Sequence, residues 1–493
     1  MITSLALAFA AALAQQATCD SLKTLSLQNT KITTVEFVPA GQYQAQGRGG
    51  QRTAGPQLPA HCRVAAVLTP SPDSHIEMEL WLPVDNWNGK FIAVGNGGWA
   101  GSIDTGAMAT SLARGYATAS NDTGHKGGSG SFGIGHPEKV VDFAYRSMHE
   151  MTLQSKAIIN AFYKRAPQLS YYNGCSTGGR QGLMEAQRYP DDFDAMVIGA
   201  PVYNHLRLHA SQMAKQTDML KDVSKILPRD KLTLVNNAVV AACDAKDGVK
   251  DGIISDPESC KFDPRTLMCS ESNKENCLTA AQVETAKTAY GAIKTKKGEL
   301  VYPGSSPGFE LGWRMPEPGG EPPAVALDSF RVAHEDANWN GLNFDLDGDF
   351  ALAVEKVGYI DAINPDLSKF KARGGKLLIY HGWADPGPAP QNTINYYSAV
   401  QQKVGGATDD WMRLFFLPGV GHCGGGVGPD RADFLSGLEQ WRESGKAPNQ
   451  IVASRTRNGQ TDMTRPLCPY PQIAKWNGTG STDDAKNFVC SQR

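Results

Sequence analysis

A serine between two glycines, at a point where a strand should end and a helix begin, constrains the fold of this chain most strongly. Residues 174–178 read Gly-Cys-Ser-Thr-Gly, with an apolar strand predicted over Leu169–Tyr172 and a helix over about Gly179–Arg188. A serine at such a turn is strained so that its hydroxyl projects from the top of a sheet, and small glycines let strand and helix approach closely. Ser176 is therefore predicted to be a nucleophile.

Strand and helix patterns alternate on both sides of this motif, which predicts an α/β fold with a mainly parallel sheet and helices on both faces. From about Asn204 to Phe370 the alternation loosens, and this stretch is expected to be an inserted lid domain. The predicted domains are a signal peptide (1–14), the catalytic domain in two parts (15–203 and 371–493) and the lid (204–370). Further strands are predicted over Arg63–Leu68, Ile76–Leu82, Phe91–Val94, Tyr116–Ser120, Ala195–Ile198, Lys376–Tyr380 and Arg413–Leu417, and a helix over Val140–Ala166.

Charge and the N-terminal leader bear on where the protein works. Lys and Arg number 48 against 50 Asp and Glu, a net charge of −2, so the basic excess that drives nucleic-acid binding is missing. Residues Ile2–Ala14 are small and apolar and resemble a signal peptide, too short to span a bilayer, and no later run of 18 or more apolar residues appears. A secreted or periplasmic protein is expected, with no membrane or nucleic-acid partner, and its ten cysteines suit an oxidising compartment.

A nucleophilic serine needs a base and an orienting carboxylate, which follow it in the order Ser, Asp, His in this type of fold. Asp385 comes directly after the predicted strand Lys376–Tyr380, and His422 lies in a glycine-rich loop directly after Arg413–Leu417. His381 competes with His422, but it precedes the acid and is expected to shape the loop. Asp409 and Asp410 are weaker rivals of Asp385, because they precede a strand and so fall at the opposite edge of the sheet.

Two backbone N–H groups are needed to stabilise the oxyanion of an acyl-transfer reaction. Thr177, directly after the nucleophile, is expected to supply one. The second is expected from the Asn-Gly-Gly-Trp loop after Phe91–Val94, from Gly97 or, as the alternative, Gly98.

An acidic loop over residues 243–253 brings Asp244, Asp247 and Asp251 together with glycines. Such hard oxygen ligands suit Ca2+, although the spacing is not that of an EF-hand. From the residues alone, a solvated turn neutralised by the neighbouring lysines is an equal alternative. A second acidic stretch, Asp345–Asp349, is better interpreted as a turn of the lid than as a metal loop.

Cys175-Ser176, Asp385 and His422-Cys423 together resemble the CS-D-HC signature of the tannase and feruloyl esterase family, which also includes the hydrolase of the PET monoester. The resemblance covers nearly the whole mature chain. It implies the α/β-hydrolase fold with a large lid, and a disulfide that joins the cysteine before the nucleophile to the cysteine after the histidine. The implied pairs are Cys175–Cys423, Cys19–Cys62, Cys243–Cys260, Cys269–Cys277 and Cys468–Cys490.

The resemblance also favours calcium at the acidic loop. It implies a structural Ca2+ in the lid, with no organic cofactor. The implied ligands are the side chains of Asp244, Asp247 and Asp251 and the carbonyl groups of Val249 and Ile253.

The expected function is hydrolysis of carboxylic esters of aromatic acids through an acyl-enzyme on Ser176. Feruloyl esters on plant cell-wall polysaccharides are the first choice, by family frequency; a tannase acting on galloyl esters and a terephthalate monoester hydrolase are the alternatives. A non-catalytic binding protein with the same fold is the rival from another class, and the intact Ser, Asp and His set argues against it. The oligomeric state stays open. Aromatic lid residues either wall a flat acyl group or form the lid core: Trp313, Phe330, Trp339 and Phe344.

Overall fold

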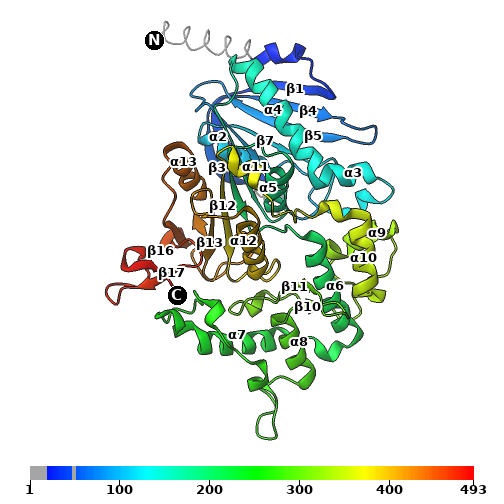
Figure 1. Ribbon diagram of the computed structural model, residues 1–493, viewed down its shortest axis with the longest axis vertical. Coiled ribbons are helices and arrows are strands. Elements are labelled where there is room, and N and C mark those ends of the chain that lie inside the picture. The colour runs from blue at the N-terminus through cyan, green and yellow to red at the C-terminus, as the bar shows by residue number, and fades with distance from the viewer. Residues whose placement is uncertain (1–18, 47–51) are drawn as a thin grey trace. The chain divides into compact units, whose positions relative to one another are not determined.

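The computed structural model describes residues 19–46 and 52–493 (Figure 1), so the predicted signal peptide lies outside the described residues. The chain divides into two compact units, Met1–Met196 and Val197–Arg493. Ser176 belongs to the first unit, whereas Asp385, His422 and the whole predicted lid belong to the second. Within the described ranges, no helix has both the length and the apolar character that a membrane crossing requires.

The first unit holds six sheet strands in the order β1-β4-β5-β7-β6-β8. The strands β1, β4, β5 and β7 pair antiparallel, whereas β6 pairs parallel with both β7 and β8. Every strand predicted before the serine is present, while β1 and a separate β2–β3 hairpin were not predicted. The bounds are β1 Thr30–Val38, β2 Gly41–Gln46, β3 Arg52–Leu58, β4 His61–Leu68, β5 Ile76–Pro83, β6 Lys90–Val94, β7 Ala117–Asn121, β8 Leu169–Cys175, α2 Thr105–Ala113, α3 Pro137–Val141, α4 Ser147–Tyr163 and α5 Thr177–Arg188.

Helices cover both faces of this part of the sheet, as predicted. Successive residues of a strand point to opposite faces. At the end of β7, the Ser120 hydroxyl accepts a hydrogen bond from the Asp104 amide at the start of α2, at 3.1 Å. The next side chain, Asn121, donates to the carbonyl of Ser147, the first residue of α4, at 3.2 Å. The helices α2 and α4 therefore lie on opposite faces of β7.

The helix predicted over Val140–Ala166 is interrupted by a π-helical turn, Asp142–Arg146, between α3 and α4. Two carbonyl oxygens of this turn accept hydrogen bonds from the buried guanidinium of Arg180 on α5, Phe143 at 3.0 Å and Ala144 at 2.7 Å. A π turn widens the helical backbone and leaves such groups in need of partners. The turn is thus stabilised from the helix that follows the nucleophile.

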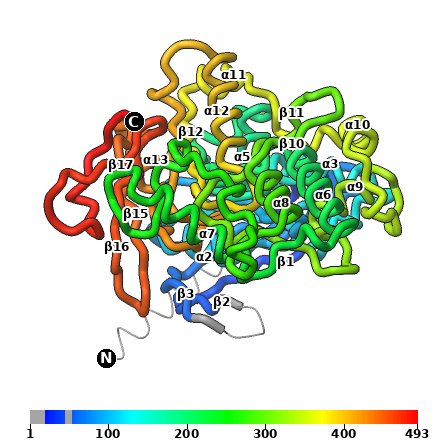
Figure 2. The backbone as a smooth tube through the Cα atoms, turned by 90° about the horizontal axis from the view of Figure 1, so that it is seen from below, coloured from blue at the N-terminus to red at the C-terminus, as the bar shows by residue number. Residues whose placement is uncertain are grey.

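The boundary between the units falls within β9, and the second unit contains the rest of β9 together with the parallel strands β12 and β13. Its C-terminal end forms small antiparallel sheets, and Figure 2 shows β15 and β16 running side by side as one long hairpin. The bounds are β9 Ala195–Gly199, α6 His205–Lys221, α7 Arg229–Cys243, α8 Ala280–Tyr290, β10 Ile293–Lys294, β11 Leu300–Tyr302, α9 Ala324–His334, α10 Leu346–Val357, α11 Ser368–Ala372, β12 Lys376–Gly382, α12 Pro390–Val404, β13 Met412–Leu417, β14 Arg431–Ala432, α13 Phe434–Ser444, β15 Ile451–Arg457, β16 Gln460–Leu467, β17 Ile473–Trp476 and β18 Phe488–Ser491.

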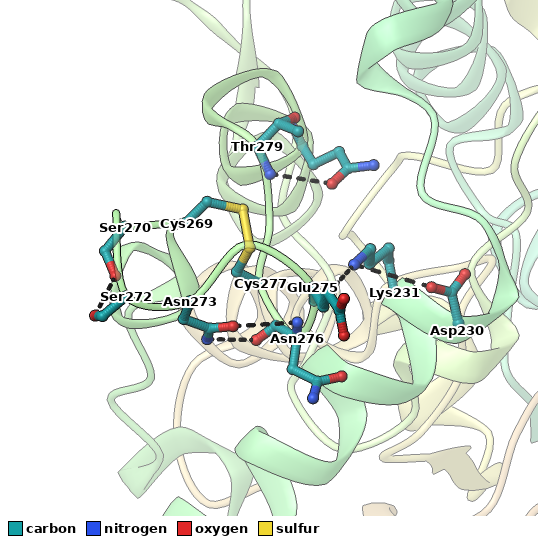
Figure 3. Close-up of a disulfide and its surroundings, with 11 residues drawn as sticks. Asp230, Lys231, Cys269, Ser270, Ser272, Asn273, Glu275, Asn276, Cys277 and Thr279 are labelled. Atoms are coloured by element: carbon teal, nitrogen blue, oxygen red, sulfur yellow. Dashed lines mark hydrogen bonds and ion pairs between the residues drawn. A yellow bond between two sulfur atoms is a disulfide. The ribbon is translucent and has the colours of Figure 1, made fainter.

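A short disulfide loop precedes α8 in the predicted lid segment (Figure 3). The Cys269–Cys277 bond closes it, and Lys231 of α7 donates to the carbonyl of Glu275 at 2.6 Å. Directly after the loop, Thr279 and Gln282 form a reciprocal capping box that starts α8. The disulfide, the lysine and the cap together fix this loop on α7 and α8.

A buried carboxyl pair lies at the end of α5. Glu185 is fully buried, and burial first, then repulsion by Asp192, raises its pKa well above the ordinary value. Asp192 in turn accepts a hydrogen bond from His149 of α4, at 2.6 Å between Nδ1 and Oδ2. Burial and the neighbouring carboxylate of Asp192 therefore both favour the protonated form of Glu185.

The variant Glu185→Gln should become more stable relative to the wild type as pH rises. Because the folded pKa of Glu185 is raised, its favourable contribution is complete below the unfolded pKa near 4.5 and is lost as pH climbs toward the folded value. Glutamine keeps an N–H donor and cannot ionise. Urea unfolding at pH 5 and pH 8 should show a relative gain of about 1 kcal/mol or more for the variant between these two values. Glu355→Gln, at an exposed position on α10, is the control and should show no such gain. If the free energies of unfolding of Glu185→Gln and the wild type change equally between pH 5 and pH 8, the pKa of Glu185 is not raised and the prediction is wrong.

Candidate active site

Ser176 occupies a one-residue turn between β8 and α5. Its backbone angles are φ 65° and ψ −122°, a combination that is costly for a residue with a side chain. β8 ends at Cys175, and α5 begins at Thr177. The strained strand-to-helix turn predicted from the sequence is confirmed.

Close packing of glycines holds this turn against the loop after β6. A Cβ on Gly95 would lie 2.3 Å from the Tyr172 hydroxyl oxygen and 2.6 Å from the Cα of Gly178. A Cβ on Gly174 would lie 2.8 Å from the carbonyl carbon of Gly178. The Tyr172 hydroxyl donates to the carbonyl of Gly178 at 2.6 Å. These positions have no room for a larger residue.

Asn96 locks the same loop onto α5. Its amide N–H donates to Gln181 Oε1, its side-chain oxygen accepts from Gln181 Nε2, both at 3.0 Å, and its carbonyl accepts from the Gly178 amide at 2.7 Å. A further bond joins the Thr177 hydroxyl to the carbonyl of Gly98, at 2.9 Å. Sequence reasoning missed Asn96 and Gln181, and only the polar residue between the two glycines of Gly-Asn-Gly could have pointed to them.

Three backbone amide groups, one at the start of α5 and two in the loop after β6, are available to bind a substrate oxygen. In the described ranges, the N–H groups of Thr177, Gly97 and Gly98 donate no hydrogen bond to the rest of the chain. Thr177 is buried and is the first residue of α5, where the helix dipole adds positive potential. These are the residues predicted for the oxyanion hole, and the arrangement suits a developing negative charge.

Asp385 and His422 come together at the carboxyl ends of β12 and β13. Nδ1 of His422 lies 2.7 Å from Oδ2 of Asp385. Gly382 permits this approach, because a Cβ there would lie 2.2 Å from the carbonyl oxygen of Val420. The side chain of Asp385 is fully buried, whereas that of His422 is 34% exposed. The predicted acid and base therefore form a hydrogen-bonded pair.

Electrostatics keep the buried Asp385 ionised. Burial by itself would raise its pKa, but the charge of His422 and hydrogen bonds from His381 and His422 lower the pKa below its ordinary value. The amide of Gly387 also donates to Oδ1 at 2.9 Å. A carboxylate with these donors can orient an imidazole and stabilise its protonated form.

The rival residues have other positions. His381 is fully buried and bonds to Asp385 Oδ2 at 3.0 Å, so it shapes the acid's loop as expected. Asp409 and Asp410 precede β13, at the opposite end of that strand from His422. They share no edge of the sheet with the Asp–His pair.

The acidic loop is folded around its own amides. Asp244 accepts from the amide of Gly252 at 3.1 Å, Asp247 from that of Val249 at 2.9 Å, and Asp251 from that of Ile253 at 3.0 Å. Burial raises the pKa values of Asp247 and Asp251. Arg465 of β16, itself buried, binds Asp251 Oδ2 at 2.6 Å.

The donor chemistry of this loop fits a calcium ion. The carbonyl oxygens of Val249 and Ile253 accept no hydrogen bond from the described residues. Together with three carboxylates they offer only hard oxygen ligands. The three carboxylates of the loop do not lie as close together as in a filled metal site, because their oxygen atoms are not all within 4.8 Å of one another. Among the described residues, one group of His, Cys, Asp or Glu side chains meets that distance, and it lies elsewhere: His149, Glu185 and Asp192.

Four of the predicted disulfides are present: Cys19–Cys62, Cys243–Cys260, Cys269–Cys277 and Cys468–Cys490. Cys175 and Cys423 are also disulfide-bonded, and the described residues include no free cysteine. The cysteine next to the serine and the cysteine next to the histidine are therefore both oxidised.

The other lid residues of interest serve the lid itself. Trp313 packs in a core with Val235 and Tyr290, and Phe330 packs edge-on against Phe344 with ring centroids 4.8 Å apart. Trp339 stacks on His334. Asp345 caps α10 by accepting a hydrogen bond from the amide of Gly348 at 3.0 Å, so this stretch forms a turn at the start of a lid helix.

Comparison with known proteins places this geometry in context. A family model described as "Tannase and feruloyl esterase" matches residues 62–491. An uncharacterized esterase of Xanthomonas campestris pv. campestris is 36% identical over 96% of this chain and 91% of its own length. A probable feruloyl esterase B-1 of Aspergillus oryzae is 34% identical over 96% of this chain and 93% of its own. The crystal structure of feruloyl esterase B from the same fungus superposes with a TM-score of 0.91 at 33% identity, over 97% of this chain and all of that one, and confirms the α/β-hydrolase fold.

Gly95→Ala should damage the serine turn. The new methyl group would push Tyr172 and α5 away from the loop, and we expect an overpacking cost of about 1–3 kcal/mol with a marked loss of esterase activity. Gly128→Ala is the control, since a Cβ there meets nothing within 4 Å. Thermal melting and turnover of an activated ester measure both effects; unchanged melting and turnover in Gly95→Ala would contradict the close packing.

Proposed function

The chain belongs to the tannase and feruloyl esterase family and is a carboxylic ester hydrolase, and from this premise we propose that it hydrolyses feruloyl esters of plant cell-wall polysaccharides. The observation that carries the catalytic part of the proposal is the strained Ser176 at the start of α5, beside amides that donate no hydrogen bond to any described residue. The choice of acyl group follows the printed names of the relatives that cover nearly the whole chain.

In the proposed mechanism, the Ser176 oxygen attacks the ester carbonyl while His422 Nε2 takes its proton. Because Nδ1 of His422 bonds to the Asp385 carboxylate, Nδ1 carries the proton and Nε2 is the basic nitrogen. The amides of Thr177 and Gly97 stabilise the oxyanion. His422 then protonates the leaving alcohol, and water, deprotonated by the same imidazole, releases the acid and restores Ser176.

We also propose that Cys175 and Cys423 are bonded to each other. Each flanks a catalytic residue, each is oxidised, and the other eight cysteines are paired among themselves. Such a bond would tether the loops of the nucleophile and the base, so that their alignment would not depend on non-covalent packing alone.

Export to an oxidising compartment, either secretion or the periplasm, completes the proposal. Its support is the disulfide-bonded state of all the described cysteines together with the leader-like Ile2–Ala14 sequence. A polysaccharide-linked substrate would be reached there.

A panel of methyl ferulate, methyl gallate and the terephthalate monoester tests the substrate class. We expect the highest kcat/KM for methyl ferulate, and Ser176→Ala should lower kcat about 10⁴-fold or more while melting at a similar temperature. Preference for the gallate would replace the feruloyl assignment with a galloyl one. No turnover of any member would contradict the aromatic-ester class, and activity retained by Ser176→Ala would remove the nucleophile.

We propose a structural Ca2+ at the acidic loop, held by Asp244, Asp247, Asp251 and the carbonyl groups of Val249 and Ile253. Support comes from the all-oxygen donor set, from the two carbonyl groups that accept no hydrogen bond within the described part of the chain, and from the repulsion among three carboxylates opposed by Arg465. When bound, the ion would supply positive charge to the loop and no chemistry to the ester.

Removal of calcium with EDTA should lower the melting temperature, and added CaCl2 should restore it. A ligand that binds only the folded state at 100 times its Kd contributes about 2.7 kcal/mol. Asp247→Asn should lose most of this response, whereas Asp345→Asn, in the acidic stretch that caps α10, should keep it. An EDTA response that is absent in the wild type, or equal in the two variants, would count against this site.

A further inference from the structure

The catalytic acid is contacted by a second histidine. Nε2 of His381 lies 3.0 Å from Asp385 Oδ2, the same oxygen that His422 approaches at 2.7 Å. On its other side, Nδ1 of His381 lies 2.7 Å from the hydroxyl of Thr393 on α12. His381, Asp385 and Thr393 are all buried, with exposed fractions of 2% or less.

The acceptors around His381 determine where its proton lies. Nε2 faces Asp385 Oδ2 and also the carbonyl of Pro388 at 3.1 Å, and both of these groups only accept. Nε2 must therefore carry a hydrogen. In the neutral ring Nδ1 is then an acceptor, so the hydroxyl of Thr393 donates to it.

We propose that Thr393 and His381 are positioning residues for Asp385: the Thr393 hydroxyl holds the ring of His381 in the orientation in which Nε2–H donates to Oδ2, and so fixes the carboxylate for His422. The proposal rests on the proposed function of Asp385 and His422. It extends the catalytic group to a chain of four side chains: Thr393, His381, Asp385 and His422.

Loss of the hydroxyl would act through the ring. Without a hydrogen-bond partner at Nδ1, the ring of His381 is held at one end only and can turn about its Cβ–Cγ bond. Turning misaligns the Nε2–H with the carboxylate of Asp385 and the carbonyl of Pro388, and a poorly aligned hydrogen bond is weaker. Asp385 would keep the Gly387 amide on Oδ1 and His422 on Oδ2, but the second donor on Oδ2 would be weakened.

Thr393→Val, which keeps the shape and removes the hydroxyl, is the first test. We expect kcat to fall about tenfold, equivalent to one lost hydrogen bond, with KM changed less than twofold. Thr393→Ser should retain nearly all of kcat. Thr152→Val is the matched control, because Thr152 is also buried and helical, yet among the described residues its hydroxyl bonds only to the carbonyl of Met148 in its own helix. A kcat of Thr393→Val within twofold of the wild type, or one no lower than that of Thr393→Ser, would overturn the proposal.

A double-mutant cycle tests whether Thr393 acts through His381. His381→Gln retains a side-chain N–H donor but has no ring nitrogen for Thr393 to hold. If the proposal holds, Thr393→Val lowers kcat in the wild type and leaves it unchanged in the His381→Gln background. Equal fold-losses in both backgrounds would show that Thr393 acts by another route and would overturn the proposal. Thermal melting of all variants checks that each is folded.

Labelling with a fluorophosphonate separates this proposal from the proposed function. It reports the reactivity of Ser176 without any assumption about the ester. If the wild type is labelled and Ser176→Ala is not, a Thr393→Val labelling rate about tenfold below the wild type supports the positioning role, and an unchanged rate overturns it. Absence of Ser176 labelling in the wild type would instead contradict the proposed function itself.

Discussion

The strained backbone of Ser176 is the constraint on which the rest of the first unit depends. A residue with a side chain holds φ 65° only when its surroundings leave no alternative. Here the surroundings are the contacts of Gly95, Gly174 and Gly178, which bring α5 against the loop after β6. The same helix carries Arg180, whose guanidinium binds the π-helical turn before α4. The energetic cost of the serine turn is thus met by packing spread over several elements.

In the second unit, a buried negative charge has the corresponding role. Asp385 is removed from water, which disfavours its ionised form, yet its pKa is lowered because two imidazoles and one amide donate to or face its oxygens. A buried carboxylate with fewer donors would take up a proton and lose its use as an orienting group. The arrangement of β12, β13 and α12 can be understood as a means of bringing those donors to one carboxylate.

Much of this was predictable from local sequence pattern. Asp385 and His422 each directly follow an apolar strand, and parallel strands bring their carboxyl ends to one edge, so position along the chain was enough to predict that this pair would meet. The turn at Ser176 was likewise predictable from the strand before it and the helix after it. The sequence did not point to Asn96, Gln181 and Arg180, because their hydrogen-bond partners come from segments far away in the chain. The spacing of apolar residues predicts helices and strands but not contacts between distant side chains. The π turn was missed for the same reason: its carbonyl groups depend on Arg180. Thr393 faces His381 from a different element, and nothing in the residue order marks that contact. The pairing of cysteines followed from the family resemblance, since spacing alone does not choose among the many possibilities.

The bond between Arg465 and Asp251 joins residues 214 positions apart in the sequence. A ribosome makes the acidic loop long before it makes β16, so until then the loop lacks the guanidinium of Arg465. The loop therefore cannot reach its final electrostatic balance until the C-terminal hairpin has been made and has docked. In that sense a segment that is synthesised late completes a site that is synthesised much earlier, and a chain terminated before β16 would carry an acidic loop without the neutralising charge of Arg465.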